Sequence, residues 1–164
     1  MAVIDFALML LFYLVIIPAS ILIHELSHGA AALILTKDKI RIYLGPVNEG
    51  KASFRIGRVL IFIKPAYTGR FVFNTLKWMD LSKFQRIVIA AAGPMGSILL
   101  SCLLSTIWMN MDSANVLHDL IAAVVIYNLL VFIATMIPLK YPRWWMDYGG
   151  MYSDGYRIMQ AMKK

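Results

Sequence analysis

Two histidines and a glutamate lie close together in the sequence His24-Glu25-Leu26-Ser27-His28. His24 and His28 are four residues apart, so on a helix they lie one above the other on the same face. Their imidazole nitrogens can then bind one zinc ion at about 2.0–2.1 Å. Glu25 lies next to that face, where a carboxylate can bind the water on the metal without being a ligand and remove its proton. The spacing therefore predicts a metal ion and a general base that act on the same water.

The cluster lies in an apolar setting. It interrupts a run from Phe6 to Thr36 in which Glu25 is the only Asp, Glu, Lys or Arg. Ionisable groups at membrane depth are costly unless they are paired, bound to a metal or facing a water-filled cavity. We therefore favour a metal site over the alternative, a structural polar cluster where a helix meets the membrane interface.

A third ligand is needed, because catalytic zinc usually has three protein ligands and one open position. The only other histidine, His118, is expected on the opposite side of the membrane, so a carboxylate is the better candidate. Asp147 and Asp154 both follow the last apolar stretch, and we favour Asp154 because Gly155 allows the backbone to turn sharply beside it. Three further candidates are more typical of a solvated surface: Asp38, Glu49 and Asp80.

Composition indicates the elements that must position these residues. Of the 164 residues, 60% are hydrophobic and 15% are charged, against about 45–50% and about 25% in soluble globular proteins. This excludes a water-soluble enzyme, a disordered tail and a nucleic-acid-binding module. Three stretches, at about 6–36, 87–109 and 120–139, reach the roughly 20 apolar residues that a membrane-spanning helix requires. We expect an all-α polytopic membrane protein with three transmembrane helices and one domain, residues 1–164.

The charges indicate an orientation. All 16 Lys and Arg residues lie either between residues 37 and 86 or after residue 139. The positive-inside rule then places the N-terminus outside, and both the long loop and the C-terminus in the cytoplasm. We therefore interpret the net charge of +7 as a sign of membrane topology, in a multi-pass protein of the cell membrane. No nucleic-acid partner is expected.

The long loop and the C-terminal segment carry further patterns. Residues 40–44, 54–56 and 59–63 are strand-like, which predicts a small β-sheet at the membrane surface. This sheet could cover the ends of the helices or offer an edge to an extended peptide. Residues 144–162 are amphipathic and aromatic, and we expect an interfacial or re-entrant segment. Cys102, the single cysteine, is expected to be a small packing residue.

The histidine motif in a membrane span, Ala92-Gly93-Pro94 in the next span and a downstream Asp154-Gly155 together resemble the site-2 protease family of intramembrane zinc metallopeptidases. The resemblance covers nearly the whole chain, because the order of spans, motifs and strand-like loop matches the family's three-helix catalytic core. It implies one zinc ion per chain, held near the cytoplasmic side by three ligands, with Glu25 as the catalytic base. The implied ligands are His24, His28 and Asp154.

The chain departs from the family pattern at three places. Ser97 and Thr135 stand where family members often carry asparagine, and fifteen residues separate Pro138 from Asp154, more than in the compact form of the motif. Asn128 is a further polar residue in the third span, where it could make an interhelical hydrogen bond. Neither a PDZ-like domain nor a nucleotide-sensing domain fits in the length, so a minimal core is expected.

The expected function is hydrolysis of peptide bonds in transmembrane or membrane-associated substrates near the cytoplasmic side. The expected partners are a membrane protein or peptide substrate and the lipid bilayer, with a regulatory membrane partner or a second copy of the chain as further candidates. One alternative is a catalytically inactive metal-binding membrane protein that acts as a chaperone or a transporter accessory subunit. Another is a membrane-surface module whose basic loop holds anionic lipid.

Overall fold

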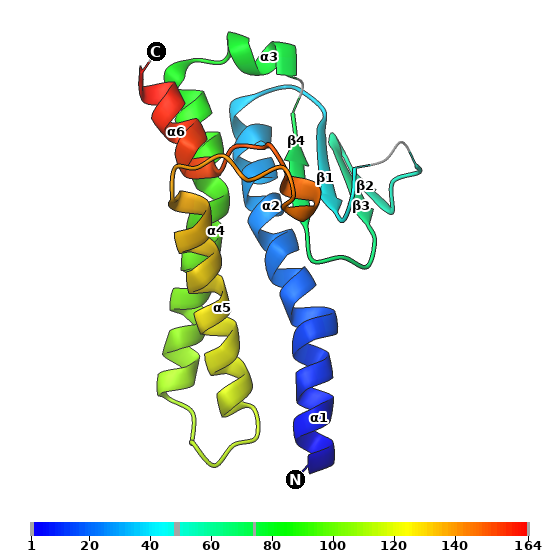
Figure 1. Ribbon diagram of the computed structural model, residues 1–164, viewed down its shortest axis with the longest axis vertical. Helices are drawn as coiled ribbons and strands as arrows, with labels where there is room; N and C mark the ends of the chain where they lie inside the picture. Colours follow the sequence, from blue (N-terminus) through cyan, green and yellow to red (C-terminus); the bar gives the residue numbers. More distant parts are fainter. Residues whose placement is uncertain (1, 48–49, 74, 164) are drawn as a thin grey trace.

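Three long helices form the body of the molecule (Figure 1). The computed structural model describes residues 2–47, 50–73 and 75–163, so Glu49 lies outside the described residues. The first helix is a continuous rod of α1 (Ala2–Leu11), a π-helical turn (Phe12–Ile16) and α2 (Ile17–Leu35). The others are α4 (Lys83–Met109) and α5 (His118–Met136). All three are long and apolar enough to cross a membrane, as the sequence predicted.

α4 begins at a capping box and continues through a proline. The Ser82 hydroxyl accepts a hydrogen bond from the Gln85 N–H, and the Gln85 side chain accepts one from the Ser82 N–H, which satisfies two N–H groups at the start of the helix. The Gly93-Pro94 pair lies inside α4. Pro94 is fully buried, and tertiary packing on both sides of α4 maintains the helix despite the missing N–H.

Proline explains two other features of the helices. α5 ends at Met136, and Ile137 is extended because the residue before Pro138 is disfavoured in the helical region. In the first helix, Pro18 lies in the first turn of α2, directly after the π-helical turn. A local π-helical turn changes the hydrogen-bond ladder at the place where proline has no N–H to contribute.

A four-stranded sheet follows α2. Its strands are β1 (Ile40–Leu44), β2 (Phe54–Ile56), β3 (Val59–Ile63) and β4 (Gly69–Val72), in the order β2-β3-β1-β4. β1 is parallel to β3 and antiparallel to β4, and β2 is antiparallel to β3. The first three strands confirm the predicted ones. β4 was not predicted, because it has four residues and begins with glycine, which is depleted in strands.

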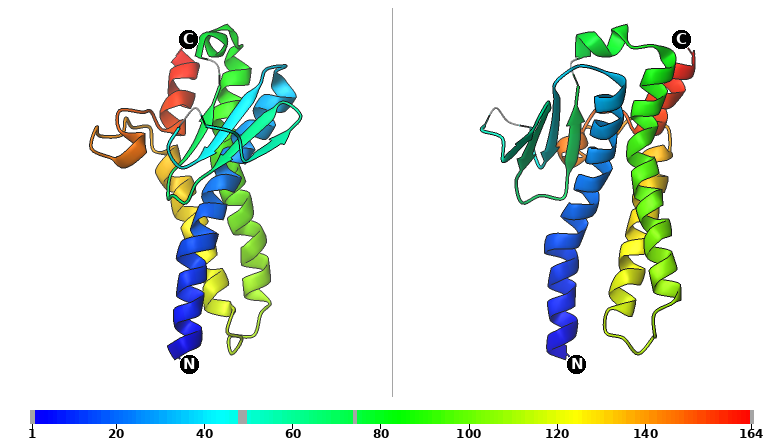
Figure 2. Two further views of the ribbon diagram at one scale, coloured as in Figure 1. Left: turned by 90° about the vertical axis from the view of Figure 1, so that its right-hand side faces the viewer. Right: turned by 180° about the vertical axis from the view of Figure 1, so that it is seen from behind.

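The sheet packs one face against α2, and that contact forms the hydrophobic core. Ile40 and Ile42 of β1 are fully buried against this helix with Ala32, and Ile89 of α4 joins the same cluster. α2 therefore lies between two layers, with the sheet on one side and α4 and α5 on the other (Figures 1 and 2). Side chains from both layers reach its polar residues.

The C-terminal region consists of two parts. An irregular segment with a 3₁₀ turn (Met146–Tyr148) follows α5, and α6 (Asp154–Lys163) packs against α4 and α5. Short α3 (Thr75–Asp80) connects β4 to α4. The N-terminus and the α4–α5 connection lie at one end of the molecule, and the sheet, α3, α6 and the C-terminus lie at the other (Figure 2).

Cys102 differs from its expectation. It lies on α4 with its side chain exposed, so the prediction of a packing residue is wrong. The apolar run around it does not reveal which face of the helix is buried, because the lipid-facing residues of a membrane helix are as apolar as those that pack inside the protein.

Replacing Ile42 by alanine tests the sheet–helix core. We expect Ile42→Ala to lower the free energy of unfolding by about 2–5 kcal/mol, because the side chain is fully buried and leaves a cavity. Ile56→Ala is the matched control, since Ile56 on edge strand β2 is 69% exposed and its loss should change stability by no more than about 0.5 kcal/mol. Thermal unfolding in detergent micelles measures both, and equal losses would contradict the assigned core.

Candidate metal centre

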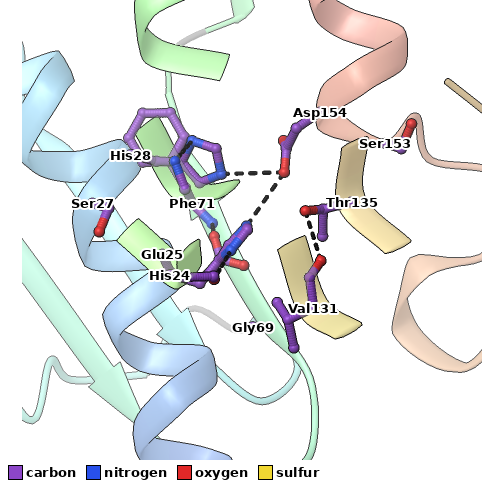
Figure 3. Close-up of polar contacts among 12 residues, drawn as sticks. His24, Glu25, Ser27, His28, Gly69, Phe71, Val131, Thr135, Ser153 and Asp154 are labelled. Carbon is purple, nitrogen blue, oxygen red and sulfur yellow. Dashed lines mark hydrogen bonds and ion pairs between the residues drawn. The ribbon is translucent and has the colours of Figure 1, made fainter. Parts of the chain in front are cut away.

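The two histidines of α2 meet Asp154, the first residue of α6 (Figure 3). Nε2 of His24 lies 3.3 Å from Oδ2 of Asp154, and Nε2 of His28 lies 3.4 Å from the same oxygen. All three residues are buried, and one ligand atom from each lies within 4.8 Å of the other two. The group is close enough to hold a metal ion.

The outer nitrogens of both rings are held by α4. Nδ1 of His28 lies 2.6 Å from the backbone oxygen of Ile89, and Nδ1 of His24 lies 2.9 Å from the hydroxyl of Ser97. A carbonyl oxygen only accepts, so Nδ1 of His28 must carry the proton, and in the neutral ring Nε2 presents a lone pair. The Gly93 N–H is also near this Nδ1, at 3.3 Å, but the much shorter contact to Ile89 determines the tautomer.

This tautomer makes the centre suited to a cation. The lone pair on Nε2 of His28 faces a carboxylate oxygen, which is also an acceptor, and two acceptors attract only when a proton or a metal ion lies between them. Burial by itself raises the pKa of the Asp154 carboxyl, but when a proton takes that place the positive charge of the His28 and His24 rings outweighs burial and holds that pKa well below its usual range. The donor set of two imidazoles and one ionised carboxylate therefore fits a metal ion.

Two glycines allow the helices around the centre to pack closely: Gly93 lets α4 approach α2, and Gly155 lets α6 approach α5. A Cβ at Gly93 of α4 would overlap the imidazoles of His28 and His24. A Cβ at Gly155 would overlap the Met136 backbone oxygen at the end of α5. Gly155 lies within α6 and is not among the glycines with a positive φ, so the expected sharp turn is wrong; its role is close packing of α6 on α5.

Glu25 lies beside the metal-binding group and is bound by the sheet. It is 8% exposed, and its Oε2 accepts a hydrogen bond of 2.6 Å from the backbone N–H of Phe71 in β4. Its side chain lines the same cavity as His24, His28 and Asp154. The carboxylate is therefore fixed near the centre by a strand that the sequence pattern did not reveal.

The cavity at the centre has a volume of about 320 Å³. Aromatic side chains from three regions line much of it. They come from the sheet region, from α5 and from the segment between α5 and α6: Tyr67, Phe71, Tyr127, Tyr141, Trp145, Tyr148 and Tyr152. The site thus combines a small polar group with a largely apolar wall, which is typical of ligand-binding clefts.

The other candidate ligands lie elsewhere. His118 begins α5 at the far end of the bundle and lies 3.1 Å from Asp119. Asp147 accepts a hydrogen bond from the Thr68 hydroxyl, and Asp38 and Asp80 are not part of the metal-binding group. Among the described residues, Asp154 is thus the acidic side chain that joins the two histidines.

The polar residues that depart from the family pattern have defined contacts. Ser97 holds His24, and Thr135 lines the cavity while its hydroxyl donates to the Val131 oxygen of its own helix. Asn128 donates to the hydroxyl of Ser20 at 3.2 Å, which is the interhelical hydrogen bond considered from the sequence. The hydrogen bond from Phe71 to Glu25 could not be predicted from the sequence, because its donor is a backbone N–H.

Comparison of the chain with protein-family models, with curated proteins and with solved structures finds no match. The inference of a function therefore rests on the geometry of the centre.

Removing one of the three side chains of the metal-binding group should weaken metal binding strongly. We expect His28→Ala and Asp154→Ala each to weaken binding more than about 100-fold, because losing a ligand costs more than losing an outer partner. Asp147→Asn is the matched control, since Asp147 is an acidic residue outside the group, and it should keep full metal content. Metal analysis after equilibrium dialysis with Zn²⁺ as the probe measures this, and retention by both ligand variants would contradict the assigned centre.

Removing the hydroxyl that holds His24 should weaken the centre without destroying it. We expect Ser97→Ala to reduce metal affinity by about 10–100-fold, because the partner of the outer nitrogen orients the ring. Ser101→Ala, one turn further along α4, removes a buried hydroxyl that donates to the Val125 oxygen instead. It should leave affinity unchanged in the same dialysis experiment, and equal losses in both variants would point to a general packing defect.

Proposed function

We propose that this chain is an intramembrane zinc metalloprotease that hydrolyses peptide bonds in transmembrane or membrane-associated substrates near the cytoplasmic side. One observation carries the proposal. Glu25, a buried carboxylate outside the metal-binding group, lines the same cavity as His24, His28 and Asp154. A metal site with only a structural role has no need of a second buried carboxylate beside it, whereas hydrolysis requires a general base there.

The donor set supports zinc as the metal. Ligands about 2.0–2.1 Å from a tetrahedral zinc ion lie about 3.3–3.4 Å from one another, and the distances from Asp154 to His24 and His28 are 3.3 and 3.4 Å. Three protein ligands also leave a fourth position open, as in catalytic sites. Zinc held there would supply a Lewis acid for the scissile carbonyl and a water whose pKa is lowered to about 7.

Glu25 is the proposed general base. Because its Oε2 accepts from the Phe71 N–H, we assign proton transfer to Oε1. This oxygen removes a proton from the attacking water and later donates it to the leaving amine, as general acid–base catalysis of peptide hydrolysis requires. The bond to β4 keeps the carboxylate in one orientation during both transfers.

The substrate is proposed to bind as an extended chain. Backbone groups in a membrane helix are already hydrogen-bonded, so a substrate helix must unwind before its carbonyl can be attacked. β4 is an edge strand of the sheet and lines the cavity beside Glu25. Such an edge can pair with an extended peptide through main-chain hydrogen bonds.

The proposed orientation places the centre at the cytoplasmic end of the bundle. The basic segments of the chain, residues 37–86 and the C-terminal tail, lie at the same end of the molecule as the sheet and α6 (Figure 1). Under the positive-inside rule this end faces the cytoplasm and the N-terminus lies outside. We propose the cell membrane as the location of the chain.

Replacing Glu25 by glutamine tests the proposed reaction. We expect Glu25→Gln to keep its zinc and to lower the rate of peptide cleavage by about 10²–10⁴-fold, because the amide has the same shape but cannot accept the proton. Cleavage is measured with a randomised peptide library in detergent micelles and mass spectrometry of the products. Zinc content is measured on the same samples.

The control is Asp119→Asn, which removes a carboxylate whose side chain is 99% exposed at the other end of α5. It should cleave at the wild-type rate. Cleavage that survives in Glu25→Gln would contradict the proposed mechanism, and a wild-type protein that binds zinc and cleaves no peptide would favour the alternative of an inactive metal-binding protein.

A further inference from the structure

Residues 140–152, here called the strap, form a closed loop between α5 and α6. Lys140 and Tyr152 pair at its base, where the Tyr141 N–H donates to the Met151 oxygen at 2.8 Å and the Gly150 N–H donates to the Tyr141 oxygen at 3.0 Å. The 3₁₀ turn forms its tip and lies beside β4 (Figure 1). The strap includes thirteen of the fifteen residues that separate Pro138 from Asp154.

The base of the strap is joined firmly to the helices on both sides. The Ser153 N–H donates to the Leu139 oxygen at 3.0 Å, and the Ser153 hydroxyl donates to the Ile137 oxygen at 2.7 Å. These bonds lie between the strap and Asp154. A displacement of the tip would therefore leave these bonds, and with them the position of Asp154, intact.

β4 directs two N–H groups away from the sheet. Thr68 accepts from the Gly45 N–H, and hydrogen-bonded pairs alternate along an antiparallel ladder. Gly69 and Phe71 therefore point their N–H groups outward. Because the Phe71 N–H holds Glu25, the Gly69 N–H is the donor of β4 that a peptide adding to this edge would use.

Both outward donors are occupied. The Gly69 N–H donates to the hydroxyl oxygen of Tyr148 in the strap at 2.8 Å, and the Phe71 N–H donates to Glu25. The strap makes further contacts with the same strand. The Thr68 hydroxyl donates to Oδ2 of Asp147 at 2.8 Å, and the Arg70 guanidinium donates to the Asp147 backbone oxygen.

The strap also forms one wall of the cavity, through Tyr141, Trp145 and Tyr148. A substrate segment that reaches this cavity therefore meets the strap.

We propose that the strap is an autoinhibitory segment that docks on the β4 edge in competition with the substrate peptide, and that its release opens the active site. This inference rests on the proposed protease function. The strap holds the Gly69 N–H through Tyr148, and an incoming substrate carbonyl takes over that donor when the tip moves away.

Weakening the docked state should raise activity. We expect Tyr148→Phe, which removes the acceptor for Gly69, and Thr68→Val, which removes the donor to Asp147 without changing the strap, each to increase kcat/KM about two- to ten-fold. Tyr156→Phe is the matched control, because Tyr156 lies on α6 outside the cavity lining, and it should leave kcat/KM unchanged. A decrease in both Thr68→Val and Tyr148→Phe would overturn the proposal, because the strap would then be a wall of the substrate site.

Locking the docked state should abolish activity reversibly. Thr68→Cys and Asp147→Cys are combined in a Cys102→Ser background, because the two native side-chain oxygens are 2.8 Å apart. We expect oxidation to stop cleavage and reduction to restore it, with zinc content the same in both states. An oxidised protein, with the disulfide shown by mass spectrometry, that cleaves as fast as the reduced one would overturn the proposal.

Hydrogen exchange separates a failure of this inference from a failure of the proposed function. In detergent micelles the Gly69 amide should exchange faster in Tyr148→Phe than in the wild type, while the Ile61 amide in β3 should be unchanged. This measurement requires no peptide cleavage. A protein that cleaves nothing as the wild type, as Tyr148→Phe and as Thr68→Val would disprove the protease function, and an unchanged Gly69 amide would overturn the strap whether or not the protein is a protease.

Discussion

The contact between Asp154 and the two histidines of α2 is the interaction on which the other features of the site depend. It places an ionised carboxylate and two imidazoles in a buried position between apolar helices, where charge is stable only with a compensating cation and hydrogen-bonded partners. α4 supplies those partners through the Ile89 backbone oxygen and the Ser97 hydroxyl. The close approach at Gly93 and Gly155 brings the backbones near enough for this set of contacts to form.

α2 can serve as the centre of the site because it is covered from two sides. α4 and α5 pack against one side, where α4 orients the histidines, while the sheet packs against the other side and holds Glu25 through the Phe71 N–H. The two histidines and the proposed general base, Glu25, are thus neighbours on one helix but are oriented by different layers. This division keeps Glu25 out of the metal-binding group while leaving it in the same cavity.

The segment after α5 has two tasks that are linked by its geometry. Its end delivers Asp154 to the centre, and its middle covers the edge of β4 through Asp147 and Tyr148. The two aspartates that were alternatives as ligands therefore have different partners. Ser153 lies between the two parts, and its bonds to Ile137 and Leu139 let the ligand remain fixed independently of the loop.

Local sequence patterns predicted the long helices and three of the strands, because hydrophobic periodicity and turn residues reflect structure within short segments. The spacing of four between His24 and His28 likewise predicted that both rings lie on one face of a helix. The neighbouring Gly155 favoured Asp154 over Asp147 and the resemblance to a known family implied the same choice, and the structure brings Asp154 to the histidines from 130 residues away. β4, the hold of Phe71 on Glu25 and the docking of the strap could not be predicted. Each depends on a backbone N–H or on a contact between distant segments, and such contacts exist only once the helices and the sheet have packed together.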